Sequence, residues 1–330
     1  MRAVRPPRQT RPHASGLARR RGGLVLPALR SLILAASGSP HAQRLVTKYG
    51  FALGAGRFVA GENAEDFLRV AAQLNARGFA VACGILGENV ASAAEAAAVT
   101  EAYCGLLQTF ARLGLDANVA FKLTHAGLDL DPELAFANAA CIAQAAAACG
   151  NTMRMDMEQS RYVDATLCVY RRLHERFENV GFVLQSYLRR SAQDLRSLLP
   201  LRPNVRLVKG AYLEPAAIAY PDKRDVDGAY IHLADMALSN EGYTALATHD
   251  RRIVEWVLRR AAQLGLPKSG RFEFQMLYGI GAPVAGELLE AGYRVRLAVP
   301  FGTHWFAYLM RRLAERPANL AFFLKGATGR

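Results

Sequence analysis

The chain has 330 residues, of which 52% are hydrophobic and 21% charged, so it can bury a sizeable core in one large domain or two smaller ones. This composition excludes a mainly disordered chain and a disulfide mini-scaffold. The five cysteines are odd in number and include no Cys-x-x-Cys pair, and no histidines are grouped at metal-ligand spacing. We therefore expect no metal site and a cytoplasmic protein in a reducing compartment.

The net charge of +13 is concentrated at the start of the chain. The first 61 residues carry eleven Lys or Arg and no Asp or Glu, whereas residues 62–330 keep 30 basic against 28 acidic side chains. A general electrostatic grip on nucleic acid requires a basic face on the folded domain, so we expect no nucleic-acid partner. The basic start leaves peripheral contact with the inner face of a membrane open.

Residues 1–23 are rich in Arg, Pro and Gly and predict a disordered basic leader. No segment reaches the roughly 18 to 20 apolar residues that span a bilayer, because the best apolar run, 24–36, contains Pro27 and Arg30. The leader lacks a continuous apolar region followed by a small-residue cleavage site, so both a true leader and a misassigned start remain open. We expect residues 24–77 to form N-terminal helices that pack outside the main domain.

From Gly78 onward, short apolar or β-branched runs alternate with stretches whose apolar residues recur at helical spacing. The runs predict eight strands: Phe79–Leu86, Asn118–Leu123, Thr152–Met157, Gly181–Tyr187, Val205–Tyr212, Tyr243–His249, Phe272–Leu277 and Arg294–Val299. Strands separated by helices need crossover connections, which produce parallel sheets. Eight such units fit an α/β protein with a (β/α)8 barrel over residues 78–330. A doubly wound sheet is the rival, but no glycine-rich dinucleotide loop follows the first strand.

In such a barrel the chemistry lies at the C-terminal ends of the strands. Those positions are unusually polar here: Lys122, Asp156, Met157, Glu158, Gln185, Tyr187, Lys209, Gly210, Ala211, Tyr212, Thr248, His249, Asp250, Gln275, Met276 and Leu277. Some have ordinary alternatives, namely a solvated lysine at 122, a helix N-cap at 156 and a turn around His249. Polar residues at so many strand ends on one rim nevertheless favour a single site.

Arg311 and Arg312 lie in the last predicted helix, where such a pair is usually solvated and favoured by the helix dipole. At a barrel mouth, two guanidinium groups would instead clamp a carboxylate. Glu315 follows Arg311 at i+4 and Arg312 at i+3, a spacing that lets it orient both arginines.

Six strings, in this order, resemble the motifs of the single-function bacterial proline dehydrogenases: Met155–Tyr162, Leu184–Arg190, Arg206–Tyr212, Ala247–Asp250, Phe272–Gly279 and Tyr308–Arg316. The resemblance runs from about Arg57 to Lys325 and does not cover the leader. It implies a distorted barrel that holds FAD at its mouth, oxidises L-proline to 1-pyrroline-5-carboxylate and passes the electrons to a quinone. It also implies a pyrroline-5-carboxylate dehydrogenase as a candidate partner.

The resemblance implies a role for each matching residue. Asp156 and Arg206 match the catalytic centre, with Arg206 near flavin N5. The substrate carboxylate would be held by Lys122, Arg311 and Arg312, and the proline ring would pack on Leu277. The positions that match FAD-binding residues are Met157, Gln185, Arg206, Lys209, Gly210, Ala211, Thr248 and His249.

One position departs from the family pattern. Ala298 stands where the family usually has a tyrosine that lines the proline pocket opposite the arginines. Alanine removes an aromatic wall and a hydroxyl and leaves room beside the ring. We therefore expect weaker proline binding, or the same chemistry on a ring-substituted proline such as 4-hydroxyproline.

Two more distant alternatives remain open from the residues alone. One is another flavin-dependent barrel reductase, of the folate reductase type, which the Arg311-Arg312 pair disfavours. The other is a basic nucleic-acid or membrane-surface protein without catalysis, which only the charge of the leader supports.

Overall fold

The computed structural model describes residues 44, 49–51, 54–87 and 89–315, so the predicted leader 1–23 lies outside the described residues. The chain divides into two compact units. One unit is Gly56–Trp305, and the other combines the two ends of the chain, Met1–Ala55 and Phe306–Arg330. The predicted boundaries at residues 23 and 77 stay predictions.

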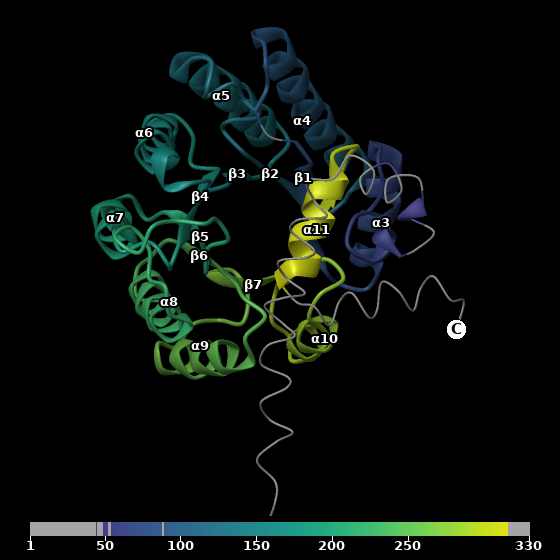
Figure 1. Cartoon of the computed structure of the whole chain (residues 1–330). Helices are drawn as coiled ribbons and strands as arrows, with labels where there is room; N and C mark the ends of the chain where they lie inside the picture. Colours follow the sequence, from purple (N-terminus) through teal and green to yellow (C-terminus); the bar gives the residue numbers. More distant parts are fainter. Residues whose placement is uncertain (1–43, 45–48, 52–53, 88, 316–330) are drawn as a thin grey trace, which may run out of the picture. The chain divides into compact units, whose positions relative to one another are not determined.

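Eight parallel strands close into a barrel, in which each strand pairs with the next and the last pairs with the first (Figure 1). The strands are β1 (Ala80–Ile85), β2 (Ala117–Phe121), β3 (Met153–Met155), β4 (Val180–Gln185), β5 (Asn204–Val208), β6 (Tyr243–Ala247), β7 (Phe272–Leu277) and β8 (Val295–Phe301). This topology confirms the predicted (β/α)8 class.

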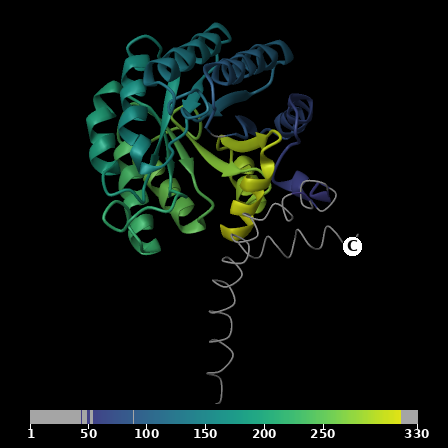
Figure 2. The same cartoon turned by 45° about the horizontal axis from the view of Figure 1, so that its top comes forward.

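Within the unit Gly56–Trp305, helices surround the strands, as Figure 1 and the turned view in Figure 2 show. Helix α3 (Ala64–Ala76) precedes the first strand, and the helices between strands are α4 (Ala93–Leu113), α5 (Pro132–Ala148), α6 (Val163–His174), α7 (Ser191–Leu198), α8 (Lys223–Leu238), α9 (Arg251–Gln263) and α10 (Ala282–Glu290). Helix α11 (Trp305–Glu315) follows the last strand in sequence, and from Phe306 onward it belongs to the other unit. Short 3-10 turns occur at η1 (Ala55–Arg57), η2 (Ser160–Tyr162) and η3 (Leu199–Leu201). No helix in these described ranges is long and apolar enough to cross a membrane.

The two faces of the strands meet different surroundings, because side chains alternate along a strand. In β7, Phe272, Phe274 and Met276 belong to the apolar core shared with the helices, whereas Glu273 and Gln275 do not. Polar contacts join strands that are not neighbours, for example Arg154 of β3 to Asn204 of β5. Only side chains inside the barrel can make such contacts, so the barrel interior is polar and the apolar core lies between strands and helices.

Helix α3 is the described helix within the region 24–77. It begins at the N-cap Asn63, whose side chain accepts from the backbone N–H of Asp66 at 2.9 Å. Its buried face packs on β1 and β8, with the ring centroids of Phe67 and Phe301 5.3 Å apart. The helix therefore covers the seam where the barrel closes.

Two glycines provide a matched test of this backbone. Gly279, after β7, has a φ of +76°, and a Cβ there would lie 1.8 Å from the carbonyl oxygen of Arg57. Gly228 lies in α8 with open space around it. We expect Gly279→Ala to lower the free energy of unfolding by about 3 kcal/mol or more, and Gly228→Ala to raise it by about 1 kcal/mol. Denaturant unfolding of both variants measures this, and equal effects would contradict it.

Candidate functional site

Asp156 and Arg206 meet at the rim formed by the C-terminal ends of the strands. Asp156 follows β3, and its backbone N–H donates to the Phe121 carbonyl at the end of β2, at 2.7 Å. Its carboxylate pairs with Nη2 of Arg206 in β5. Because β4 lies between β3 and β5, this ion pair spans the inside of the barrel mouth. The N-cap alternative for Asp156 is wrong, since η2 and α6 begin at Ser160 and Val163 and have other caps.

Gln185 ends β4 and is 2% exposed. Its Nε2 donates to the Met157 carbonyl at 3.3 Å, whereas its Oε1 has no hydrogen-bond partner among the described residues. The buried Nε of Arg206 likewise has no partner within the described part of the chain. Buried polar atoms are nearly always satisfied, so two unsatisfied ones on the same rim mark a place for a polar ligand.

Lys209 follows β5 and belongs to a cluster of four alternating charges. Its Nζ contacts Asp227 Oδ1 at 2.6 Å and Asp250 Oδ2 at 3.1 Å, and both carboxylates also pair with Lys223. Burial alone would raise the pKa of Asp250, but the hydrogen bonds from the two lysines outweigh it and hold that pKa at about 2. Asp250 is also the N-cap of α9, where it accepts from the backbone N–H of Arg252 at 3.2 Å. The cluster thus ties the end of β5 to α8 and α9.

The backbone next to Lys209 requires glycine. Gly210 has a φ of +111°, and a Cβ there would lie 2.2 Å from the ring of Tyr187. Burial raises the pKa of Tyr187 to about 12, and nearby Glu214 adds to the effect. Gly210 leads into the exposed Ala211, so the backbone is open to a ligand at this point.

The turn predicted around His249 is present. Thr248 Oγ1 accepts from the backbone N–H of Asp250 at 3.1 Å, and His249 Nε2 accepts from the backbone N–H of Leu277 at 3.3 Å. A Cβ at Gly281 would lie 2.6 Å from His249 Nδ1, so the ring is closely surrounded. The turn alternative and a ligand-binding role for Thr248 and His249 are compatible, because the turn brings both side chains to the rim.

The remaining predicted residues divide between the two units. Lys122 directly follows β2, and Leu277 at the end of β7 pairs in register with Ala298 of β8. Ala298 also pairs with Ala82 of β1. Arg311 and Arg312 lie on α11, in the second unit, and the side chain of Glu315 is outside the described part of the chain.

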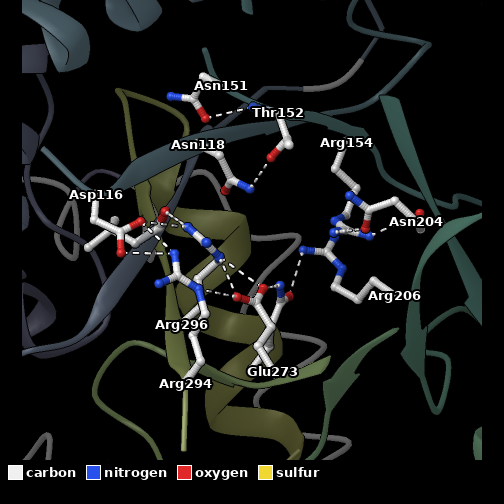
Figure 3. A network of polar contacts seen from close by, with 12 residues as sticks. Asp116, Asn118, Asn151, Thr152, Arg154, Asn204, Arg206, Glu273, Arg294 and Arg296 are labelled. Atoms are coloured by element: carbon white, nitrogen blue, oxygen red, sulfur yellow. Dashed lines mark hydrogen bonds and ion pairs between the residues drawn. The ribbon is translucent and has the colours of Figure 1, made fainter. Parts of the chain in front are cut away.

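Below the rim, a network of charged residues fills the barrel (Figure 3). At its centre is Glu273 of β7, 1% exposed, whose two oxygens accept from Arg296 Nε at 2.9 and 3.1 Å. Arg294 Nε adds a contact at 3.3 Å. We did not predict these residues from the sequence, although the alternation of polar and apolar residues in β7 and β8 is the signal that could have revealed them.

Glu273 remains ionised despite its burial. Burial would raise its pKa, but Arg296, by charge and by hydrogen bonds, and Gln275, by a hydrogen bond, together hold the pKa at about 2. For buried Arg154 the effects that disfavour the charged form prevail, since burial and repulsion from Arg206 lower its pKa to about 10. Glu273 is therefore the carboxylate that compensates the buried guanidinium groups.

The stability of the protein should depend on Glu273 in acid. Because its pKa falls from the ordinary 4.5 to about 2 on folding, its stabilising effect is complete above about pH 5 and is lost as the pH drops toward 2. We expect Glu273→Gln to remove about 3 kcal/mol of that pH dependence and to destabilise the protein at pH 7. Urea unfolding of both proteins between pH 7 and pH 2 measures the difference, and parallel pH curves would refute it.

Comparisons with known proteins agree with this architecture. The proline dehydrogenase family model matches residues 67–325. Proline dehydrogenase 1 of Bacillus subtilis subsp. natto is 43% identical over 298 residues, which cover 90% of this chain and 98% of that protein. Proline dehydrogenase of Deinococcus radiodurans is 41% identical over 302 residues, 90% of this chain and 97% of that protein.

A similar fold occurs in the crystal structure of proline utilization A (PutA) from Bdellovibrio bacteriovorus inactivated by N-propargylglycine, with a TM-score of 0.76 and 27% identity. The match covers 87% of this chain but 35% of that one, so this chain spans about a third of its length. The relatives that it matches almost end to end are the separate enzymes from Bacillus and Deinococcus. The chain belongs to the proline dehydrogenase family, in its standalone bacterial form.

Proposed function

We propose that this protein oxidises L-proline to 1-pyrroline-5-carboxylate, with FAD as the two-electron acceptor. Membership of the family supports the reaction class and decides against a folate-type reductase and a non-catalytic basic protein. The single observation that carries the assignment to this rim is the partly buried ion pair of Asp156 and Arg206, on the same rim as the unsatisfied Oε1 of Gln185.

The rim residues fit a flavin. Gln185 offers an unsatisfied acceptor, Arg206 an unsatisfied donor, and Gly210 a backbone without a side chain. Lys209 adds a cation suited to phosphate groups. The residues that would hold FAD are Met157, Gln185, Arg206, Lys209, Gly210, Ala211, Thr248 and His249. When bound, FAD supplies the hydride acceptor that no amino-acid side chain can replace.

The protein's own part in the reaction is to orient the substrate and to balance charge. Lys122, Arg311 and Arg312 would hold the proline carboxylate, and Leu277 would contact the ring. Arg206 would stabilise the negative charge that develops on the acceptor, and Asp156 keeps that guanidinium in place. Pairing Arg206 with a carboxylate also lowers the cost of burying it at the mouth.

We propose further that the electrons pass to a quinone, as the family resemblance implies, and that the basic start of the chain permits peripheral contact with a membrane. The product is a cyclic imine, so a dehydrogenase that oxidises it after hydrolysis is the partner that its chemistry requires. The matched PutA chain is almost three times as long as the segment it shares with this one, which leaves room for a second enzyme in that protein.

One observation favours a substituted proline as the substrate. The in-register neighbours of Ala298 are Ala82 on β1 and Leu277 on β7, and Ala82 is as small as Ala298 itself. Two adjacent small side chains at this part of the barrel leave space where the family usually has a tyrosine ring. A hydroxyl group on the substrate ring would occupy that space.

The first test is the visible spectrum of the purified protein, followed by anaerobic titration with L-proline and, separately, trans-4-hydroxy-L-proline. We expect a flavin spectrum that bleaches with one compound or both, since either ring can donate a hydride from the carbon next to its nitrogen. A colourless protein that FAD cannot reconstitute would refute the assignment, and a flavin that neither compound bleaches would refute the substrate class.

Replacing the small residue tests the pocket. We expect Ala298→Tyr to lower the half-saturating concentration of L-proline by about tenfold, equivalent to ~1.4 kcal/mol, because the added ring restores a wall against the substrate. The same change should abolish bleaching by hydroxyproline, whereas Ala298→Ser, which adds no wall, should preserve it. Identical substrate preferences in Ala298→Tyr and the unaltered protein would show that a neighbour already fills the space.

A further inference from the structure

We propose that Glu273 and Gln275 are positioning residues that hold Arg206 at the barrel mouth, with Glu273 acting through the orientation of the Gln275 amide. This inference rests on the proposed role of Arg206 beside the flavin. Neither residue matches a position that the family resemblance assigns to substrate or cofactor. Both lie on the inner side of β7, below the rim.

The contacts form a short chain from the barrel interior to the rim. Gln275 Nε2 donates to Glu273 Oε1 at 2.6 Å, and Arg206 Nη1 donates to Gln275 Oε1 at 3.4 Å. The other guanidinium nitrogen, Nη2, pairs with Asp156. Arg206 is thus held from two sides, by β7 and by the residue after β3, and its 9% exposure leaves little room to move.

The carboxylate of Glu273 decides which end of the amide faces Arg206. A glutamine amide can place either its oxygen or its NH₂ group in nearly the same space, so its neighbours fix the orientation. An ionised carboxylate only accepts hydrogen bonds, so it must receive the NH₂ group of Gln275. The oxygen is then left for Arg206, which has only donors to offer.

Glu273 is itself held firmly. The single N–H at Arg296 Nε is shared between both oxygens of its carboxylate, and Arg296 Nη1 donates to the Val81 carbonyl on β1 at 2.8 Å. The orientation of Gln275 is therefore fixed by three neighbouring strands, β7, β8 and β1. Figure 3 shows Glu273 between Arg296 on one side and Arg206 on the other.

Gln275→Met in the FAD-loaded enzyme tests the proposal, because methionine keeps the volume and loses both hydrogen-bonding ends. We expect a crystal structure to show the Arg206 guanidinium displaced from Asp156. We also expect the ratio of the protein's affinities for reduced and oxidised flavin to fall about tenfold. This change lowers the two-electron midpoint potential of the bound flavin by about 30 mV. The turnover number should fall about tenfold while the KM for the bleaching substrate changes less than twofold, since Arg206 does not bind the substrate carboxylate.

Asn118→Ala is the matched control. Asn118 is similarly buried inside the barrel, on β2, but its side-chain Nδ2 donates to Thr152 Oγ1 at 3.1 Å. We expect its midpoint potential and kcat to equal those of the unaltered protein. Equal shifts of the flavin midpoint potential in Gln275→Met and Asn118→Ala would mean that any loss of a polar group inside the barrel has this effect, and they would overturn the proposal. A Gln275→Met variant in which neither the position of Arg206 nor the midpoint potential changes would overturn it as well.

An exchange of the two groups tests the orientation directly. In Glu273→Gln the amide at 275 is free to turn its NH₂ group toward Arg206, so the potential should fall as in Gln275→Met. In the double variant E273Q/Q275E, the carboxylate at 275 offers Arg206 an oxygen in either orientation. The flavin midpoint potential should therefore return at least halfway to that of the unaltered protein. No recovery in a folded double variant would overturn the role of the amide orientation.

Failure of the proposed function is separable from failure of this inference. An unaltered protein that takes up no flavin, or whose flavin no proline compound bleaches, refutes the proposed function. The crystallographic position of Arg206 in Gln275→Met still decides the inference, because that readout needs no turnover.

Discussion

Inside the barrel, among the residues that the structure describes, the guanidinium groups of Arg154, Arg206 and Arg296 lie close to the buried carboxylate of Glu273. An uncompensated buried charge costs several kcal/mol, so the arrangement is stable only while Glu273 stays ionised and hydrogen-bonded. Arg296 of β8 donates a hydrogen bond to it, and Gln275 links it to Arg206 through two further hydrogen bonds. The geometry of the rim therefore depends on a residue that cannot itself touch a substrate bound at the mouth.

This polar interior explains where the apolar core lies. Many barrels of this class fill their centre with branched apolar side chains. Here Phe272, Phe274 and Met276 of β7 point instead toward the helices, and the hydrophobic stabilisation comes from the layer between strands and helices. The interior is thus left to charge and hydrogen bonding, which hold Arg206 in one position more precisely than apolar packing does. A second charge cluster, Lys209 with Asp227 and Asp250, links the end of β5 to α8 and α9.

The sequence predicted the eight strands because apolar alternation and helical spacing are strong local signals. It extended some of them too far: Thr152–Met157 is a strand only at Met153–Met155, and Val205–Tyr212 stops at Val208. Asp156 and Lys209, which directly follow those ends, still make backbone hydrogen bonds to Phe121 and Tyr187, but the regular strand pairing has ended. The alternation in β7 places Glu273 on the face opposite the apolar residues, but a polar face on a strand ordinarily indicates solvent, and only barrel closure places that face inside. The roles of Arg311 and Arg312 stay predictions from the motif.

The seam between β1 and β8 has a consequence for how the chain is made. Arg296 reaches the carbonyl of Val81 across 215 residues of sequence, and β1 pairs with β8 along its whole length. During synthesis β1 emerges first and keeps an unpaired edge until β8 leaves the ribosome, a time of about 10 to 40 s at ordinary elongation rates. Exposed strand edges invite pairing with other chains. The helix α3, which emerges before β1 and later covers this seam, is placed to shield its apolar side while the barrel is still open.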